Sequence, residues 1–148
     1  MEDIEDFKKS IGKKSRLLGI DPGKKRVGIA ISDENKLVST PLKTIIKKNN
    51  TNVINDILEI IKENNIKGIV VGNPINMDGS KGPSSQSAKD FAKNLSNNIS
   101  IPIVMWDERL SSQGAFNLSS NLNINTSKKV EKLDQNAASF ILQGAIDY

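Results

Sequence analysis

Three short apolar segments joined by tight turns, followed by an alternation of helical and strand-like segments, constrain the fold of this chain most strongly. The three segments are Arg16 to Ile20, Val27 to Ser32 and Leu37 to Thr40. Turn-forming residues separate them, as Asp21-Pro22-Gly23 after the first segment and Asp33-Glu34-Asn35 after the second. This arrangement predicts three strands in an antiparallel meander.

The rest of the chain predicts helices and strands in turn. In chain order these are a helix over Asn52 to Asn64, a strand over Gly68 to Gly72, a helix capped by Ser84 or Ser85 and running to about Asn97, a strand over Ile101 to Trp106, a helix capped by Ser111 or Ser112 and running to Leu122, and a last helix beginning at Asp134. A meander followed by two right-handed crossovers predicts an α/β fold with a mixed five-stranded sheet in the order 3-2-1-4-5 and helices on both faces.

The chain is expected to form one domain preceded by a short arm. Residues 1–15 carry four acids and four lysines and show little apolar periodicity, so they are expected to be a flexible or peripheral N-terminal arm. Residues 16–148 hold all the predicted strands and helices, and no repeat or long linker divides them. A single domain over residues 16–148 is therefore expected.

The composition excludes several kinds of catalytic site. The 148 residues include no Cys and no His, which excludes disulfides, a thiolate nucleophile, a Ser-His-Asp triad and a metal bound by His or Cys. Any catalysis must use carboxylates, Lys, Arg, hydroxyls or a bound hard cation. No apolar run approaches the ~20 residues of a membrane-spanning helix and no signal peptide is visible, so a cytoplasmic protein without a membrane partner is expected.

Four acids stand where the predicted fold brings them to one edge of the sheet. Asp21 follows the first strand, Asp107 and Glu108 follow the last strand, and Asp134 begins a helix with a face of small residues. Taken singly, each has an equally good structural explanation. Asp21 would open a turn, Asp107 and Glu108 would be a solvated charged pair, and Asp134 would cap a helix. In open α/β sheets, however, the edge at which parallel strands end is the one that binds ligands.

Carboxylates gathered at one edge repel one another, and a divalent cation removes this repulsion. Oxygen ligands without His or Cys suit Mg²⁺ or Mn²⁺. The sequence therefore predicts a two-metal phosphoryl-transfer site with Asp21, Asp107, Glu108 and Asp134 as candidate metal ligands.

Basic residues near these acids are candidates for binding a nucleic-acid backbone. Lys24, Lys25 and Arg26 crowd the turn beside Asp21, although such a turn is also typical of an ordinary solvated surface. Arg109 could stabilise charge on a phosphoryl group or pair with Asp107. The other candidates, each also explained by a solvated loop, are Lys81, Lys128 and Lys129. The net charge of +4 is weak evidence for a nucleic-acid partner, because a coding bias toward A and T also produces a Lys-rich composition.

Five sequence motifs together resemble one known family. They are GIDPGKKRVGIAISD, PLKTI, IVVGNPINMDGSKGP, WDERLSS and KLDQNAASFILQGAID, and they span residues 19–147. In this order and spacing they resemble the YqgF (RuvX) family, whose members have a ribonuclease H-like fold and are described as Holliday junction resolvases or pre-16S ribosomal RNA nucleases. The chain differs from that pattern at Asn73, where relatives commonly have an apolar residue, and at Gly114.

The resemblance implies site residues and a substrate. It places the catalytic acids of the family on Asp21, Asp134 and the Asp107-Glu108 pair, where Glu108 is preferred. It implies a Mg²⁺-dependent nuclease (or one that uses Mn²⁺) that processes the 5′ end of precursor 16S ribosomal RNA, leaving 5′-phosphate and 3′-hydroxyl ends.

Several alternatives remain open from the sequence. The substrate could instead be branched DNA, as for a Holliday junction resolvase, or the chain could be a non-catalytic RNA-binding factor in ribosome assembly. The Asp21-Pro22-Gly23 turn also occurs in kinases and actin-like ATPases, although those enzymes close two such domains around the nucleotide and one is expected here. The oligomeric state is not predicted.

Overall fold

The computed structural model describes residues 3–74, 81–108 and 126–148, with side chains in the last range from Leu133 onward. The strands are β1 (Arg16–Pro22), β2 (Arg26–Ser32), β3 (Ser39–Ile46), β4 (Ile66–Asn73) and β5 (Ile103–Asp107). The helices are α1 (Ile4–Ser10), α2 (Asn50–Asn64), α3 (Pro83–Ser96) and α5 (Thr126–Asp147). The helix expected from Ser111 or Ser112 to Leu122 lies outside the described residues.

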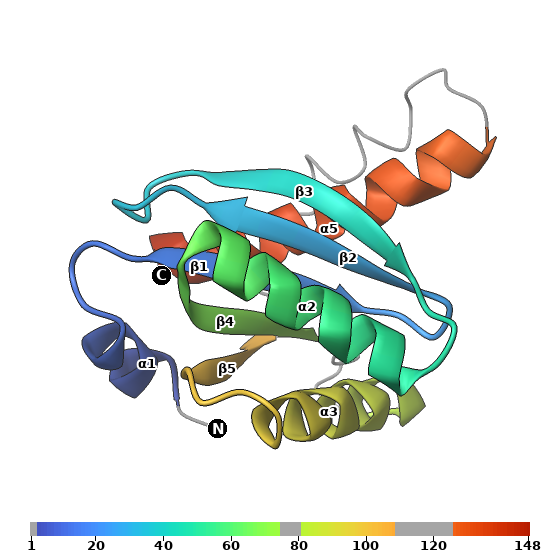
Figure 1. Cartoon of the computed structure of the whole chain (residues 1–148), viewed down its shortest axis with the longest axis horizontal. Helices are drawn as coiled ribbons and strands as arrows, with labels where there is room; N and C mark the ends of the chain where they lie inside the picture. The colour runs from blue at the N-terminus through green and yellow to red at the C-terminus, as the bar shows by residue number, and fades with distance from the viewer. Residues whose placement is uncertain (1–2, 75–80, 109–125) are drawn as a thin grey trace.

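The strands form one sheet in the order β3-β2-β1-β4-β5, which confirms the predicted order. β1, β2 and β3 are antiparallel neighbours, whereas β4 is parallel to both β1 and β5. Helices α2 and α3 cover one face of the sheet and α5 crosses the other (Figure 1). The parallel strands β1, β4 and β5 consequently end at the same edge of the sheet.

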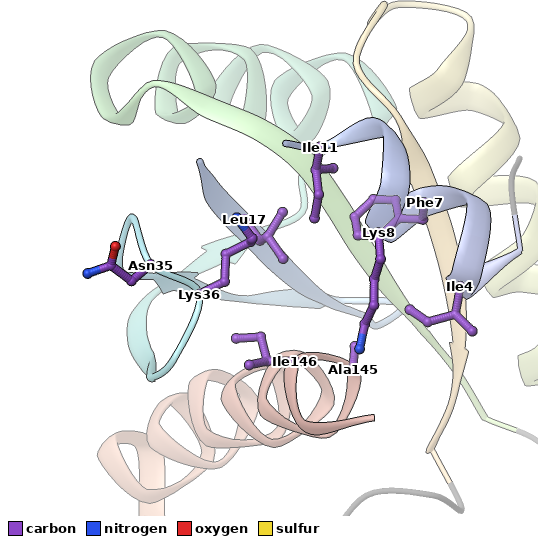
Figure 2. Close-up of a pocket in the computed structure, with 9 residues that line it drawn as sticks. All are labelled: Ile4, Phe7, Lys8, Ile11, Leu17, Asn35, Lys36, Ala145 and Ile146. Atoms are coloured by element: carbon purple, nitrogen blue, oxygen red, sulfur yellow. The ribbon is translucent and has the colours of Figure 1, made fainter. Parts of the chain in front are cut away.

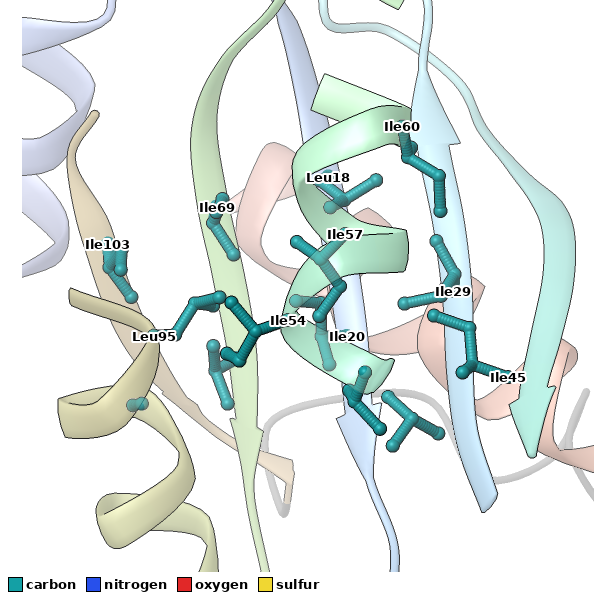
Figure 3. Packing of buried hydrophobic residues seen from close by; sticks show 14 of the residues in the cluster. Leu18, Ile20, Ile29, Ile45, Ile54, Ile57, Ile60, Ile69, Leu95 and Ile103 are labelled. Atoms are coloured by element: carbon teal, nitrogen blue, oxygen red, sulfur yellow. The ribbon is translucent and has the colours of Figure 1, made fainter. Parts of the chain in front are cut away.

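The face under α2 and α3 holds the larger core. Figure 3 shows α2 directing Ile54, Ile57 and Ile60 toward apolar side chains of the sheet. The helix begins with a reciprocal capping box between Asn49 and Asn52 and ends at Asn65, whose left-handed φ of 53° stops the helix. Each isoleucine buried here contributes roughly 1.5–3 kcal/mol to the stability of the fold.

The opposite face is closed by α5. Ala138, Ile141, Leu142 and Ala145 are buried there against side chains that include Trp106. Successive residues of β4 alternate between the two faces, with Val70 in this core and Ile69 and Val71 in the other. The face of small residues predicted for the last helix is therefore confirmed.

No helix among the described residues has the length and hydropathy needed to cross a bilayer.

The segment expected to be a flexible arm includes a packed helix. Asp3 caps α1 by accepting the backbone N–H of Asp6, and Phe7 is only 1% exposed. Phe7 and Ile11 stand four residues apart, so they share one face of the segment and pack on Leu17 and the end of α5. A cavity of about 200 Å³ lies beside this contact, and Figure 2 shows the residues that line it. Part of the segment expected to be an arm is thus helical, and one buried aromatic residue packs it against the domain.

Replacing Phe7 by Leu is expected to lower the free energy of unfolding by about 1–2 kcal/mol, because the substitution leaves a cavity against Ile11 and Leu17. Urea unfolding monitored by circular dichroism measures this change. Lys9→Ala is the control, since Lys9 is exposed on the same helix and its loss should cost less than about 0.5 kcal/mol. Equal effects of the two substitutions would show that α1 is not anchored.

The bounds of the third strand differ from those expected. The third strand runs over Ser39–Ile46 and not over Leu37 to Thr40, because Asp33 accepts the backbone N–H groups of Leu37 and Val38 at 2.8 and 2.9 Å and holds them in the turn. Pro41 fits inside this strand since β3 is an edge strand, where a missing N–H is tolerated.

The start of α3 also differs from expectation. Neither Ser84 nor Ser85 caps the helix, which begins at Pro83 after Gly82. Ser85 is instead fully buried, and its hydroxyl donates to Asn73 Oδ1 at 2.8 Å. This hydrogen bond ties α3 to the last residue of β4, and it accounts for a polar residue at Asn73.

Candidate active site

The acids at the ends of β1 and β5 meet at the edge of the sheet. Asp21 lies near the end of β1, Asp107 is the last residue of β5, and Glu108 follows it. A side-chain hydrogen bond joins the Asp21 and Glu108 carboxyls. Asp107 lies next to Asn73 in register and acts on Glu108 through its charge. The structure thus brings together the acids predicted from the first and last strands.

Burial and mutual repulsion make these carboxyls poor acids. Desolvation, followed by the charges of Glu108 and Asp134, raises the pKa of Asp21 from 3.8 to about 7. Desolvation and the charge of Asp107 also raise the pKa of Glu108, while its hydrogen bond with Asp21 opposes the rise. Without a cation, the Asp21–Glu108 pair therefore retains a proton close to neutral pH.

The raised pKa predicts that the metal-free fold loses stability as pH rises. Asp21 ionises near 3.8 in the unfolded chain and near 7 in the folded one, so its favourable contribution is complete below pH 4 and is lost as pH rises through 7. Urea unfolding in EDTA should show wild type less stable at pH 8 than at pH 5, and Asp21→Asn more stable than wild type at pH 8 by on the order of 2 kcal/mol.

Asp33→Asn is the control with the opposite sign. Hydrogen bonds from the Val38 and Leu37 amides lower the pKa of Asp33, so removing its charge should destabilise the protein at pH 8. Identical pH profiles for wild type and Asp21→Asn would contradict the burial of the Asp21 carboxyl.

The third acid reaches the site from the middle of a helix. Asp134 was expected to begin the last helix as a cap, but α5 begins at Thr126, eight residues earlier. Its distance from the helix start excludes a capping role. Asp134 instead lies where α5 crosses β2, close enough for its charge to raise the pKa of Asp21.

Glycines in the strands allow α5 to approach the sheet closely. A Cβ at Gly28, the β2 residue paired with Asp21, would overlap the backbone carbonyl of Asp134. A Cβ at Gly19 would lie 2.6 Å from the Leu142 Cβ. At Gly72 it would lie 2.7 Å from Glu108 Oε1, so this glycine makes room for the carboxylate itself. This role of the glycines was not predicted, although Gly28 stands in the VGIAIS alternation and pairs with Asp21.

Arg26 is paired with one of the acids. Its Nε donates to Asp134 Oδ2 at 2.7 Å, and the two side chains are 38% and 24% exposed. The guanidinium was expected to contact nucleic acid, and here it neutralises the third carboxylate. Because both side chains retain exposure, either can still reach a ligand.

The other predicted basic residues divide into three groups. Lys24 and Lys25 are exposed in the β1–β2 turn beside Asp21. Lys81 is exposed before α3, and a hydrogen bond with the neutral form of Lys89, followed by the Lys81 charge, lowers the pKa of Lys89. Arg109 and the side chains of Lys128 and Lys129 lie outside the described residues.

The structure brings the predicted metal ligands together only in part. Within the described ranges, no three His, Cys, Asp or Glu side chains are grouped as a ready-made metal site. Asp21 and Glu108 are in contact, whereas the Asp134 carboxylate faces Arg26. The arrangement is a partly buried acidic pair with a third acid beside it, and this third acid is paired with a counter-charge.

Known proteins match the chain over almost its whole length. The family model of RuvX, described as Holliday junction resolvase, matches residues 15–148. A protein named "Putative pre-16S rRNA nuclease" from Pelagibacter ubique (strain HTCC1062) is 57% identical over 145 residues, covering 98% of this chain and 96% of the relative. A protein of the same name from Ruegeria sp. (strain TM1040) is 45% identical over 144 residues, covering 97% and 92%.

Two solved structures share the fold. Thermus thermophilus RuvC in complex with a Holliday junction substrate matches with a TM-score of 0.58 at 13% identity, over 89% of this chain and 93% of that one. The yeast mitochondrial Holliday junction resolvase Ydc2 matches with a TM-score of 0.50 at 12% identity, over 97% and 82%. At such low identity these matches show the ribonuclease H-like fold alone.

Proposed function

The chain belongs to the RuvX family, and on this premise we propose that it is a divalent-cation-dependent nuclease that hydrolyses phosphodiester bonds in structured nucleic acid. The observation that carries the proposal is the partly buried contact between the Asp21 and Glu108 carboxyls, with Asp134 beside it, at the ligand-binding edge of the sheet. The proposed substrate is precursor 16S ribosomal RNA, the substrate in the names of its relatives. Residues 16–148 are proposed to form the nuclease domain.

The acidic residues suit a hard divalent cation, and we assign Mg²⁺ with Mn²⁺ as its substitute. Asp21 and Glu108 supply carboxylate oxygens only, in a setting where desolvation and the charges of neighbouring carboxylates raise both pKa values. Asp107 is the candidate for a further oxygen ligand at the end of β5. When bound, such cations activate the attacking water and stabilise the leaving 3′ oxygen.

Asp134 and Arg26 are proposed to act together. In the structure the Arg26 guanidinium partly offsets the charge of Asp134, which still raises the pKa of Asp21. Asp134 would be a further oxygen ligand for the cation once this ion pair is given up. Arg26 is then available to a phosphate oxygen, which suits the planar donor geometry of a guanidinium.

The exposed cations at the same edge are proposed to hold the backbone of the substrate. Lys24 and Lys25 lie beside Asp21, and Lys81 stands before α3. Contacts of this kind position the nucleic acid on the protein without recognising its base sequence. The same role is proposed for Arg109, Lys128 and Lys129 from their places in the sequence.

Branched DNA is the second candidate substrate. The family model is described as Holliday junction resolvase, and RuvC, which shares the fold, is solved with a Holliday junction substrate. The acidic residues are equally suited to either backbone, because the phosphodiester group is common to RNA and DNA.

One cleavage panel tests the proposed function. Wild type and Asp134→Asn are incubated in Mg²⁺ with precursor 16S RNA, unstructured single-stranded RNA and a DNA four-way junction, and the product ends are mapped. We expect wild type to cleave the precursor fastest, leaving 5′-phosphate and 3′-hydroxyl ends, and Asp134→Asn to be strongly impaired. Faster cleavage of the junction would favour the resolvase. Tight, salt-sensitive RNA binding without cleavage in either Mg²⁺ or Mn²⁺ would favour a non-catalytic assembly factor.

A further inference from the structure

A groove of about 240 Å³ opens at the same end of the sheet as the acids, but on the face covered by α2 and α3. Pro22 and Lys24 of the β1–β2 turn form one wall, and Lys47 after β3 forms another. Along the strand, Ile20 packs in the core under α2, so the Asp21 side chain points to the α5 face and Pro22 returns to the groove. The groove and the acidic pair therefore lie on the two sides of one short stretch of backbone.

The third wall is the first half of α3. Ser84, Ser87 and Phe91 are spaced three and four residues apart and present one face of the helix to the groove. Phe91 is partly buried and packs against the core under α2, which holds its ring in place. The Lys47 backbone N–H donates to the Lys25 carbonyl at 2.9 Å, which fixes the end of β3 against the β1–β2 turn. These contacts bring Lys47 and Lys24 to the same groove.

We propose that this groove binds one unpaired nucleotide of the substrate next to the scissile phosphate, with its phosphate on Lys24 and Lys47 and its base stacked on Phe91. The inference rests on the proposed nuclease function and adds Lys47 and Phe91 to the residues that hold the substrate. Ser84 and Ser87 offer hydroxyls to the sugar and to the edge of the base.

The chemistry of the walls favours a nucleotide over other ligands. Among the described residues that line the groove none is acidic, while two lysines line it, so it attracts an anion. A bare phosphate would not need the phenyl ring, and an apolar ligand would not need two ammonium groups. Aromatic rings beside basic residues are the usual platform for single-stranded nucleic acid. The volume is below the ~300 Å³ of typical small-molecule sites, which leaves room for one nucleotide and excludes a base pair.

The basic surface continues along α3 beyond the groove. Lys81 stands just before α3 and Lys89 lies on this helix, so both add positive charge to this part of the surface. Such an arrangement gains stability when a polyanion lies across it. A strand leaving the groove along α3 would meet this pair.

The test measures binding of single-stranded hexanucleotides, RNA and DNA in parallel, that carry one 2-aminopurine. Binding is followed by fluorescence anisotropy in EDTA, so that cleavage does not occur, and stacking is followed by 2-aminopurine quenching. Phe91→Leu keeps an apolar side chain but removes the ring, and should abolish the quenching and weaken binding about tenfold. Lys47→Gln should weaken binding several-fold and reduce the slope of log K against log salt by about 0.7. Thermal unfolding checks that Phe91→Leu remains folded, and Lys47, which is only partly buried, gives a second, independent test.

Lys67→Gln is the matched control, because Lys67 is exposed at the start of β4, the opposite end of the sheet. It should bind like wild type. Failure of wild type to bind either hexamer, or equal losses in Lys47→Gln and Lys67→Gln, would overturn the groove assignment.

Cleavage measured on the same proteins separates this inference from the proposed function. If wild type cleaves nucleic acid while Phe91→Leu and Lys47→Gln bind and cleave as wild type does, the groove assignment is overturned and the nuclease stands. If quenching depends on Phe91 but wild type cleaves nothing in Mg²⁺ or Mn²⁺, the groove assignment is supported and the nuclease is overturned.

Discussion

Asp21→Asn is expected to lower the single-turnover cleavage rate by about 10² to 10³-fold, the size of loss seen when one preorganised electrostatic group is removed from an active site. The substitution keeps the shape of the side chain and removes one charge of the buried pair with Glu108. Its measurement uses saturating Mg²⁺ and whichever substrate wild type cleaves fastest. Because the same substitution should stabilise the metal-free fold at pH 8, a slow variant with raised stability separates a catalytic defect from misfolding.

Three further substitutions of the same kind serve as comparisons. Glu108→Gln should lose about as much activity as Asp21→Asn, and Asp107→Asn should lose less, because the Glu108 carboxyl is the one that contacts Asp21. Asp33→Asn removes a carboxylate in the β2–β3 turn and should leave the rate unchanged. A rate for Asp21→Asn within about threefold of wild type, less than 1 kcal/mol of activation free energy, would remove Asp21 from the site.

Gly28→Ala should impair both stability and cleavage without altering any acid. The added Cβ overlaps the backbone carbonyl of Asp134, so α5 must move away from β2. Overpacking of this kind costs about 1–3 kcal/mol of unfolding free energy. The displaced helix carries Asp134 out of position, and a loss of about a hundredfold in cleavage rate is expected even where the variant is fully folded.

Gly12→Ala separates this effect from a general cost of replacing glycine. A Cβ at Gly12 meets nothing within 4 Å, but its φ of +76° disfavours alanine. Gly12→Ala should therefore lose about 1 kcal/mol of stability and keep its cleavage rate. If folded Gly28→Ala cleaves as fast as folded Gly12→Ala, the close approach of α5 does not position Asp134.

The order of the strands could be predicted from the sequence because it depends on strong local signals. Asp21-Pro22-Gly23 and Asp33-Glu34-Asn35 mark turns, and the apolar run GIVVG is typical of a strand buried on both faces. Because crossover connections between parallel strands are right-handed, few strand orders are then possible. The structure confirms the sheet order and the use of both faces.

Elements held by tertiary contacts could not be predicted in the same way. The strand β3 extends through Pro41, which local rules treat as a strand breaker and which an edge position tolerates. Helix α1 depends on burying Phe7 against a distant part of the chain, which its short and highly charged sequence does not indicate. Ser85 suggested a helix cap, yet its hydroxyl is turned inward to Asn73.

The site was predictable to a similar extent. Strand ends identify Asp21 and Glu108, because parallel strands that are neighbours in a sheet end at the same edge. The pairing of Arg26 with Asp134 and the spaces left by Gly28 and Gly72 depend on how deeply α5 is seated on the sheet. Sequence periodicity shows which face of a helix is buried, but it does not give this depth.

Crystals soaked in Mn²⁺ and measured at the manganese absorption edge test the central claim most directly. In wild type we expect an anomalous peak for a manganese ion bound by carboxylate oxygens of Asp21 and Glu108. In Asp21→Asn we expect no peak at that position. A wild-type protein that cleaves nucleic acid in Mn²⁺ while its anomalous peaks lie away from Asp21 and Glu108 would contradict the account.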